Sequence, residues 1–192
     1  MNKQEKKNLA YIIGVALGDG NLSNPNKRAI RLRITCDSKY PKIGTEITQA
    51  LKLLFPSNKV SYVHRKEKTC FDISVYSNKL DAYIPWKVGC GTKHEQQAQV
   101  PDWVLNDVDF IHPCLKGLIQ TDGSIYQDRG YMMINFTNII KPLAKNVESM
   151  IKKLGYTPHL YQSMQKTGKM KYVVRLSKNT RNFIKELNLT KE

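Results

Sequence analysis

The 192-residue chain carries 31 basic and 16 acidic residues, which gives a formal net charge of +15 spread along its whole length. A folded chain this basic favours nucleic acid as its partner, with an anionic membrane surface second. Its apolar runs are far shorter than the ~20 residues that span a bilayer. No basic amphipathic helix stands out either, so a membrane protein is not expected.

The N-terminus and the cysteines indicate the compartment. The first eight residues are polar and charged, and they lack the apolar region of a signal peptide. The cysteines are scattered without a C-x-x-C pair, which is typical of free thiols in a reducing compartment. They are Cys36, Cys70, Cys90 and Cys114. We expect a protein that is not secreted, and that is cytoplasmic or organellar.

The first half of the chain alternates between helical and strand patterns. The predicted elements are a helix over 6–18 ending at Gly20, turn residues 21–27, a strand over 29–35, a helix over 42–55, strands over 59–65 and 70–76 joined by the loop 66–69, and a short helix over 79–84. In the strand 29–35, Ile30, Leu32 and Ile34 share one face and polar residues the other. This pattern indicates a half-buried strand whose outer face contacts a partner.

The second half repeats the same order after a connecting segment over 88–100. The predicted elements are a helix over 111–121, a strand over 131–137, a helix over 141–154, strands over 159–165 and 170–176 joined by the loop 166–169, and a last helix from Thr180. Residues 34–36 align with 136–138, and residues 73–84 with 173–184. The first strand of the first repeat is expected to be short, near 21–23. The chain is therefore predicted to be an α+β protein with two repeats of an αββαββα unit, 1–100 and 101–192.

One short stretch occurs in both repeats, over residues 12–20 and 115–123. Each copy is an apolar run with a central Gly, a small residue four positions later, and a final Asp-Gly. In that order these are Gly14, Gly18, Asp19 and Gly20 in the first copy, and Gly117, Thr121, Asp122 and Gly123 in the second. Small residues at this spacing lie on one helical face and let two helices approach closely. Each copy therefore indicates a buried helix with an Asp at its carboxyl end.

A carboxylate at the carboxyl end of a helix is unfavourable, because that end already carries about half a negative charge. If the two helices pack through Gly14 and Gly117, Asp19 and Asp122 meet at two negative poles and need a cation. Oxygen ligands without His or Cys favour Mg²⁺ over zinc. The alternative is two ordinary core helices that end in exposed Asp-Gly turns, and the repetition of the whole pattern disfavours it.

Both stretches resemble the LAGLIDADG motif, and the chain resembles a monomeric, two-motif LAGLIDADG homing endonuclease. The resemblance implies that the motif helices pack at the centre of the molecule. It also implies two antiparallel sheets that form a saddle on the major groove of double-stranded DNA. The polar strand residues that would contact DNA are Arg31, Arg33, Thr35, Tyr131, Asn135, Lys171 and Arg175. Because the duplication supplies both halves, the chain is expected to act as a monomer.

The resemblance further implies the catalytic centre. Asp19 and Asp122, with Gly18 and Thr121 beside them, would hold two or three Mg²⁺ ions. The family often has Gln or Asn after the Thr that ends the inner strand. Asn138 fits this pattern in the second repeat, whereas Cys36 departs from it in the first, and a thiol orders water poorly. Lys93 resembles a family lysine that precedes the second motif. These residues are Asp19, Asp122, Asn138 and Lys93 as catalytic groups, and Asp19, Asp122, Gly18 and Thr121 as metal ligands.

Three functions are compatible with this pattern: a sequence-specific DNA endonuclease, an RNA-splicing maturase that binds its intron RNA, and a non-catalytic DNA-binding regulator. Retention of both Asp residues favours the nuclease. The histidines are too far apart for a histidine-metal nuclease, and no phosphate-binding P-loop is present. An intein is not expected, because neither end of the sequence carries splicing-junction residues.

Overall fold

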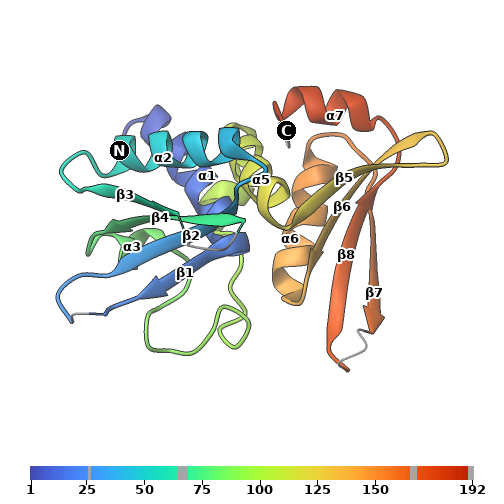
Figure 1. Ribbon diagram of the computed structural model, residues 1–192. Coiled ribbons are helices and arrows are strands. Elements are labelled where there is room, and N and C mark those ends of the chain that lie inside the picture. The colour runs from blue at the N-terminus through green and yellow to red at the C-terminus, as the bar shows by residue number, and fades with distance from the viewer. Residues whose placement is uncertain (26, 65–68, 165–167, 190–192) are drawn as a thin grey trace.

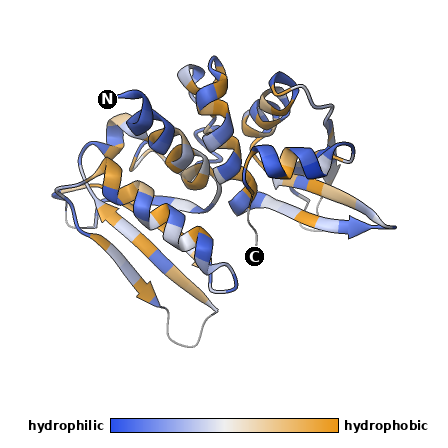
Figure 2. Ribbon diagram, turned by 90° about the horizontal axis from the view of Figure 1, so that it is seen from above, coloured by the Kyte–Doolittle hydropathy of each residue, from blue (hydrophilic) through white to orange (hydrophobic). Residues whose placement is uncertain are grey.

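The computed structural model describes residues 1–25, 27–64, 69–164 and 168–189. Two helices, α1 (Lys3–Asp19) and α5 (Val108–Asp122), pack side by side at the centre, and one four-stranded sheet extends from each side of this pair (Figure 1). Seen from above, the sheets spread in opposite directions, and hydrophilic and hydrophobic residues alternate along the strands (Figure 2).

The start of each central helix is marked by a side-chain cap. The Asn2 side chain accepts a hydrogen bond from the Glu5 backbone nitrogen, and the Glu5 carboxylate accepts one from the Asn2 nitrogen. This reciprocal pair satisfies two of the backbone donors that a helix start leaves unpaired. Asp107 caps α5 in a similar way, accepting from the Asp109 nitrogen. Both helices then run through the core and end in an Asp, as the sequence predicts.

The first sheet is antiparallel, with strand order β1-β2-β4-β3, and the second has the corresponding order β5-β6-β8-β7. The strands are β1 (Gly20–Ser23), β2 (Arg31–Asp37), β3 (Val60–His64), β4 (Cys70–Tyr76), β5 (Gly123–Asp128), β6 (Tyr131–Asn138), β7 (His159–Met164) and β8 (Met170–Leu176). The short first strand expected near 21–23 is present as β1. The α+β class and the duplicated order of elements are thereby confirmed.

The remaining helices are α2 (Pro41–Leu54), α3 (Leu80–Tyr83), α4 (Asp102–Leu105), α6 (Lys141–Lys153) and α7 (Thr180–Glu186). Of these, α2, α6 and α7 pack on the sheets, and α4 packs on the central helix α5. The α2 helix packs on the first sheet and α6 on the second, and both sheets also contact the central helices. The alternating residues Leu32 and Ile34 are fully buried under this cover. Their polar neighbours consequently face outward, as predicted for this strand.

One predicted alignment is wrong within the strands. The sequence pairs residue 73 with 173, but the ladders place Ile73 opposite Ile34 and Val174 opposite Phe136. Since residues 34 and 136 are equivalent, the true equivalent of Ile73 is Val174. Six residues separate Ile73 from the start of α3 at Leu80, but five separate Val174 from the start of α7 at Thr180, and this difference restores the alignment at the helices.

Two predicted loops lie mostly outside the described residues: 66–68 of the loop 66–69, and 166–167 of the loop 166–169. All four cysteines are free thiols, as expected. In the described ranges, none of the helices has the length and apolar character needed to cross a bilayer.

Candidate catalytic centre and nucleic-acid interface

The central helices touch through their glycines. A Cβ placed on Gly117 would lie 2.6 Å from the Tyr11 carbonyl oxygen and 2.8 Å from the Val15 nitrogen. A Cβ on Gly14 would collide with the backbone of Cys114, and one on Gly18 with the side chain of Thr121. The two backbones are therefore in near contact, and the predicted packing through Gly14 and Gly117 is confirmed.

This packing places the carboxyl ends of both helices next to one ammonium group, that of Lys93. Its Nζ donates hydrogen bonds to the carbonyl oxygens of Ala16 at 3.1 Å and Leu17 at 2.9 Å, and also to that of Gly18. The positive charge thus lies at the negative pole of α1, where it is favoured. The sequence predicts Mg²⁺ near this place, and the Lys93 ammonium is a further positive charge at the end of α1.

The last turns of the two helices, which carry the two acidic residues, are in contact through Gly18 and Thr121. Burial lowers the pKa of the Lys93 ammonium, while the negative charges of Asp122 and Asp19 act in the opposite direction. The ammonium also lies 5.4 Å from the centre of the buried Trp86 ring, within the range of a cation–π contact.

Asp122 lines a cleft of about 520 Å³. Its Oδ2 accepts a hydrogen bond of 2.6 Å from the Asn138 side-chain nitrogen, and the Asn138 oxygen accepts one of 2.8 Å from the Ile140 backbone nitrogen. The amide is therefore held from both ends and orients the carboxylate. Lys93 and Lys169 line the same cleft, together with Gly18 from the other central helix.

Asp19 lines a second, smaller cleft of about 190 Å³, together with Thr121 from the other central helix. Here Cys36 takes the position that Asn138 has in the first cleft. Burial, and then the charges of Asp19 and Asp72, raise the pKa of the Cys36 thiol to about 12. Asp37 adds a further carboxylate. No basic side chain lines this cleft within the part of the chain that the structure describes.

The outer faces of the two sheets carry the predicted DNA-contacting residues. Directly paired residues share a face, so Arg33 lies beside Ser74, and Asn135 beside Arg175. All seven predicted residues lie on these faces, namely Arg31, Arg33, Thr35, Tyr131, Asn135, Lys171 and Arg175. The Nε atoms of Arg33 and Arg175 and the Oδ1 atom of Asn135 have no hydrogen-bond partner among the described residues.

Comparison with known proteins agrees with this geometry. Residues 109–188 match the model of the LAGLIDADG-like domain. A structure of an I-DmoI variant in complex with its target DNA in the presence of magnesium is similar to this chain, with a TM-score of 0.71 and 21% identity, over 98% of this chain and 99% of that one. This chain is a LAGLIDADG-fold protein. The fold extends over both repeats, because the structural match covers nearly the whole chain.

Two further proteins are similar to this chain, one in structure and one in sequence. The N-terminal LAGLIDADG domain of DUF199/WhiA is similar with a TM-score of 0.65 and 13% identity, over 97% of this chain and 85% of that one. A DNA polymerase from Thermococcus sp. (strain GE8) is 24% identical over 154 residues, which are 78% of this chain. The match covers only 8% of the polymerase's length, so the activity of the polymerase is not assigned to this chain.

The donor atoms at the helix ends fit a divalent cation in an open site. Asp19 and Asp122 supply carboxylate oxygens, and Thr121 has a backbone carbonyl beside Asp122. The Gly18 carbonyl, predicted as a metal ligand, instead accepts a hydrogen bond from the Lys93 ammonium. Among the described residues, no group of three or more His, Cys, Asp or Glu side chains comes together as a complete metal cage. Mg²⁺ is commonly held by one or two carboxylates, with waters and substrate phosphates completing its shell. The residues present fit such an ion with DNA phosphates as the missing ligands.

A buried hydrogen-bond network escaped the sequence reasoning. The Tyr11 hydroxyl donates to the Gln120 side-chain oxygen at 2.8 Å, the Gln120 nitrogen donates to Glu46 at 2.9 Å, and Lys116 donates to Glu46 at 3.0 Å. Gln120 is 4% exposed and lines the Asp19 cleft. The only sequence signal was the polar residue Gln120 within the mostly apolar second motif. Trp86 and Lys169 carried no signal at all.

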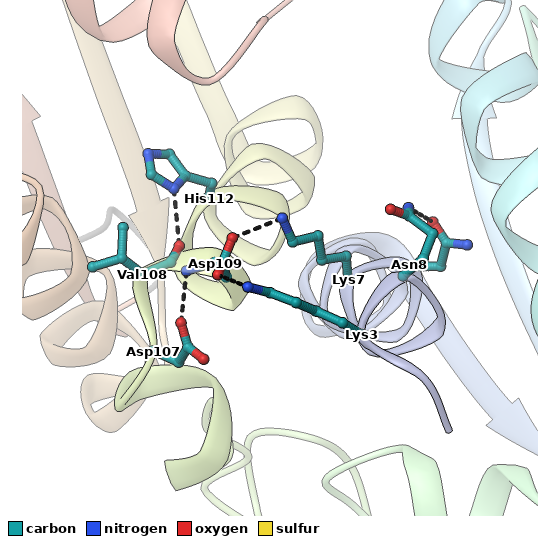
Figure 3. Close-up of polar contacts among 8 residues, drawn as sticks. Lys3, Lys7, Asn8, Asp107, Val108, Asp109 and His112 are labelled. Atoms are coloured by element: carbon teal, nitrogen blue, oxygen red, sulfur yellow. Dashed lines mark hydrogen bonds and ion pairs between the residues drawn. The ribbon is translucent and has the colours of Figure 1, made fainter.

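Ion pairs join the two central helices near their amino ends. Lys3 and Lys7 of α1 both form ion pairs with Asp109 of α5, the Lys7 pair at 2.7 Å (Figure 3). One turn further on, His112 makes a hydrogen bond through Nδ1 to the Val108 carbonyl oxygen (Figure 3) and through Nε2 to Glu186. The helices are thus tied at their amino ends and present carboxylates at their carboxyl ends.

Proposed function

We propose that this LAGLIDADG-fold protein is a site-specific DNA endonuclease. It makes a double-strand break within one long, asymmetric site by divalent-metal-dependent phosphodiester hydrolysis, and it acts as a monomer. The observation that carries the proposal is the pair of carboxylates, Asp19 and Asp122, one from each repeat, at the ends of two glycine-packed helices whose last turns touch through Gly18 and Thr121. A protein that only binds DNA gains nothing from two carboxylates beside phosphates.

DNA binding follows from the outer sheet faces. A strand ribbon fits the major groove, where each base pair presents a distinct edge, and Arg side chains suit guanine edges and phosphates. The two faces differ in sequence, so the two half-sites differ and the whole site is asymmetric. The net charge of +15 adds phosphate contacts, which makes binding strongly dependent on salt.

The reaction needs a water oxygen to bond to phosphorus while the bond from phosphorus to the 3′ oxygen breaks. Two or three bound Mg²⁺ ions would supply charge stabilisation and lower the pKa of the attacking water. The chain's own part is to place the carboxylates of Asp19 and Asp122, one for each strand. Asn138 orients Asp122 through its hydrogen bond, and Lys93 offsets negative charge where the two helices end.

The relatives support the proposal without deciding it. I-DmoI is described as a homing endonuclease, and its structures include complexes with DNA and manganese and with DNA and calcium. Use of a divalent metal by this chain is consistent with those complexes. No observation favours intron RNA as a partner, so maturase activity is not proposed.

The test is selection from a randomised duplex library. The protein is incubated with the library in Mg²⁺ or in EDTA, and the cut ends are sequenced. We expect cut ends in Mg²⁺ that share one long motif without dyad symmetry, and none in EDTA. A library that stays intact in Mg²⁺ while the protein still binds one sequence selectively would overturn the nuclease and identify a DNA-binding regulator.

A further inference from the structure

The outer faces of the two sheets can be compared position by position, because the ladders of the two repeats correspond. Ile34 and Phe136 hold equivalent places, since each pairs with the Gly that follows the motif Asp. Side chains on one face of a strand recur at every second residue. Counted outward from the ends of the central helices, the equivalent pairs on the outer faces are Arg33 with Asn135 and Arg31 with Met133.

At these positions the first sheet carries two guanidinium groups. Arg31 is oriented by its neighbours in the adjacent strands. Its Nε donates a hydrogen bond to the Ser23 hydroxyl at 3.2 Å, and its Cζ lies 6.0 Å from the centre of the Tyr76 ring. A guanidinium held through Nε keeps its Nη groups for a planar acceptor, such as the N7 and O6 atoms of guanine in the major groove. Arg33 lies on the same face, nearer the helix ends, so this face favours guanine.

The second sheet has an amide where the first has Arg33. The Asn135 Nδ2 donates a hydrogen bond to the Tyr126 hydroxyl at 2.9 Å, whereas its Oδ1 is buried without a partner among the described residues. A buried acceptor that lacks a donor costs roughly 1–3 kcal/mol. If the amide turns toward the groove, adenine can satisfy it, because adenine N6 donates to the amide oxygen and N7 accepts from the amide nitrogen.

The neighbouring positions on this outer face are apolar or aromatic. Met133 lies opposite Tyr126 of β5. Val173 is 4% exposed and lies opposite the exposed Tyr161 of β7, whereas its equivalent in the first sheet is Asp72. Thymine is the base whose major-groove edge carries a methyl group, and apolar side chains contact that methyl group. The second face therefore favours thymine beside the adenine.

Arg175 is also on the second face, but part of its guanidinium is used within the sheet. It pairs with Asn135 in the ladder, and its Nη2 donates to the Asp128 carboxylate at 3.3 Å. A carboxylate at this place competes with a base edge for the guanidinium and repels phosphates. The groups that the second face offers to bases are thus an amide and an apolar surface.

We propose that the two repeats recognise half-sites of different base composition. Counted outward from the break, Arg33 and Arg31 contact guanine at two positions of the first half-site. In the second half-site, Asn135 contacts adenine, and Met133 with Tyr126 contacts the methyl group of thymine at the next position outward. This inference rests on the DNA binding of the proposed function and names the bases that the protein selects. G·C pairs on one side of the break and A·T pairs on the other give the site its direction.

The experiment selects bound DNA without cleavage. The full chain is mixed with a randomised duplex library in EDTA, and the bound duplexes are recovered and sequenced. We expect one shared motif, with guanine at two positions of one half and adenine followed by thymine in the other. Arg33→Ala should lower discrimination at one guanine by about tenfold or more, and Asn135→Ala should do so at the adenine, each without change in the opposite half. Lys52→Ala, which removes an exposed cation in the last turn of α2, is the control and leaves every base preference unchanged.

Exchange of the two equivalent side chains gives the sharpest readout. Arg33→Asn should change the preferred base at its position from guanine to adenine, and Asn135→Arg should change adenine to guanine. A folding defect weakens binding to every sequence alike, so a change confined to one position reports a base contact.

Cleavage is measured separately, in Mg²⁺ on the recovered duplex. The base assignment is overturned if the two halves prefer the same bases at these positions, if no base is preferred there, or if the exchanges leave the preferences unchanged. Selective binding with the expected bases but no cleavage overturns the nuclease instead, and leaves the base assignment standing.

Discussion

The two halves of the molecule share a backbone plan but not a chemical environment. Thr35 and Thr137 occupy equivalent places, yet Thr35 faces Asp72 across the ladder and Thr137 faces Val173. The Thr35 hydroxyl donates to Asp72 at 2.7 Å. Inward positions such as Leu32 and Ile134 stay apolar in both halves because the core requires it. Divergence therefore occurs on the outer sheet faces and in the two clefts that Asp19 and Asp122 line, while the fold is kept.

The largest effect is expected where the two halves meet. Gly117→Leu forces side-chain atoms into the Tyr11 carbonyl and the Val15 nitrogen, so the helices must separate. We expect the free energy of unfolding to fall by about 3 kcal/mol or more, the upper range for overpacked sites. Chemical denaturation followed by circular dichroism measures this change.

A matched pair on the same interface sharpens the test. Gly18→Ala collides with the Thr121 side chain and not with backbone, so Thr121→Gly in the same protein should recover stability. No side-chain change can relieve Gly14→Ala, which meets the Cys114 backbone. Two results would contradict close packing of the central helices. One is wild-type stability in Gly117→Leu. The other is that Thr121→Gly restores as much stability to Gly14→Ala as it restores to Gly18→Ala.

The next effect compares two arginines of the outer sheet faces, Arg33 and Arg175. Neither Nε atom has a hydrogen-bond partner among the described residues, but Arg175 also forms an ion pair through Nη2 with Asp128 at 3.3 Å. We expect Arg33→Ala to weaken binding to the recovered duplex by about 10- to 100-fold, the loss of a base or phosphate contact of roughly 1–3 kcal/mol. Asp128→Asn should instead strengthen binding, because it releases Arg175. Fluorescence anisotropy at fixed salt measures both, and unchanged affinity in Arg33→Ala would remove that arginine from the interface.

Much of this architecture could be predicted because local patterns set it. The alternation Leu32, Ile34 in β2 and the small residues Gly14 and Gly117 each specify a face without knowledge of the rest of the chain. The strand alignment failed because the one-residue difference before α7 appears only in the ladder. Lys93 illustrates the other limit: its capping of α1 depends on a connecting segment with no periodicity, more than seventy positions along the chain.

The smallest effect is expected at the far end of the helix pair. Hydrogen bonds from Lys3 and Lys7 lower the pKa of the Asp109 carboxyl to about 2, below its ordinary value of 3.8. A folded pKa below the unfolded one adds stability above about pH 4 and loses it as the pH falls toward 2. Asp109→Asn should therefore lower the melting temperature slightly at pH 7 and not at pH 2. Asp102→Asn, at the start of α4, is the control. An equal shift at both pH values would exclude the ion pairs as the cause.

The central claim is that Asp19 and Asp122, one from each half, act together on one duplex. The most direct measurement is cleavage of the recovered duplex in Mg²⁺ by Asp19→Ala and Asp122→Ala, with DNA affinity measured on the same samples. We predict that each variant binds with near wild-type affinity and no longer makes the double-strand break. A double-strand break by either variant, at a rate near that of the wild-type protein, would contradict the account.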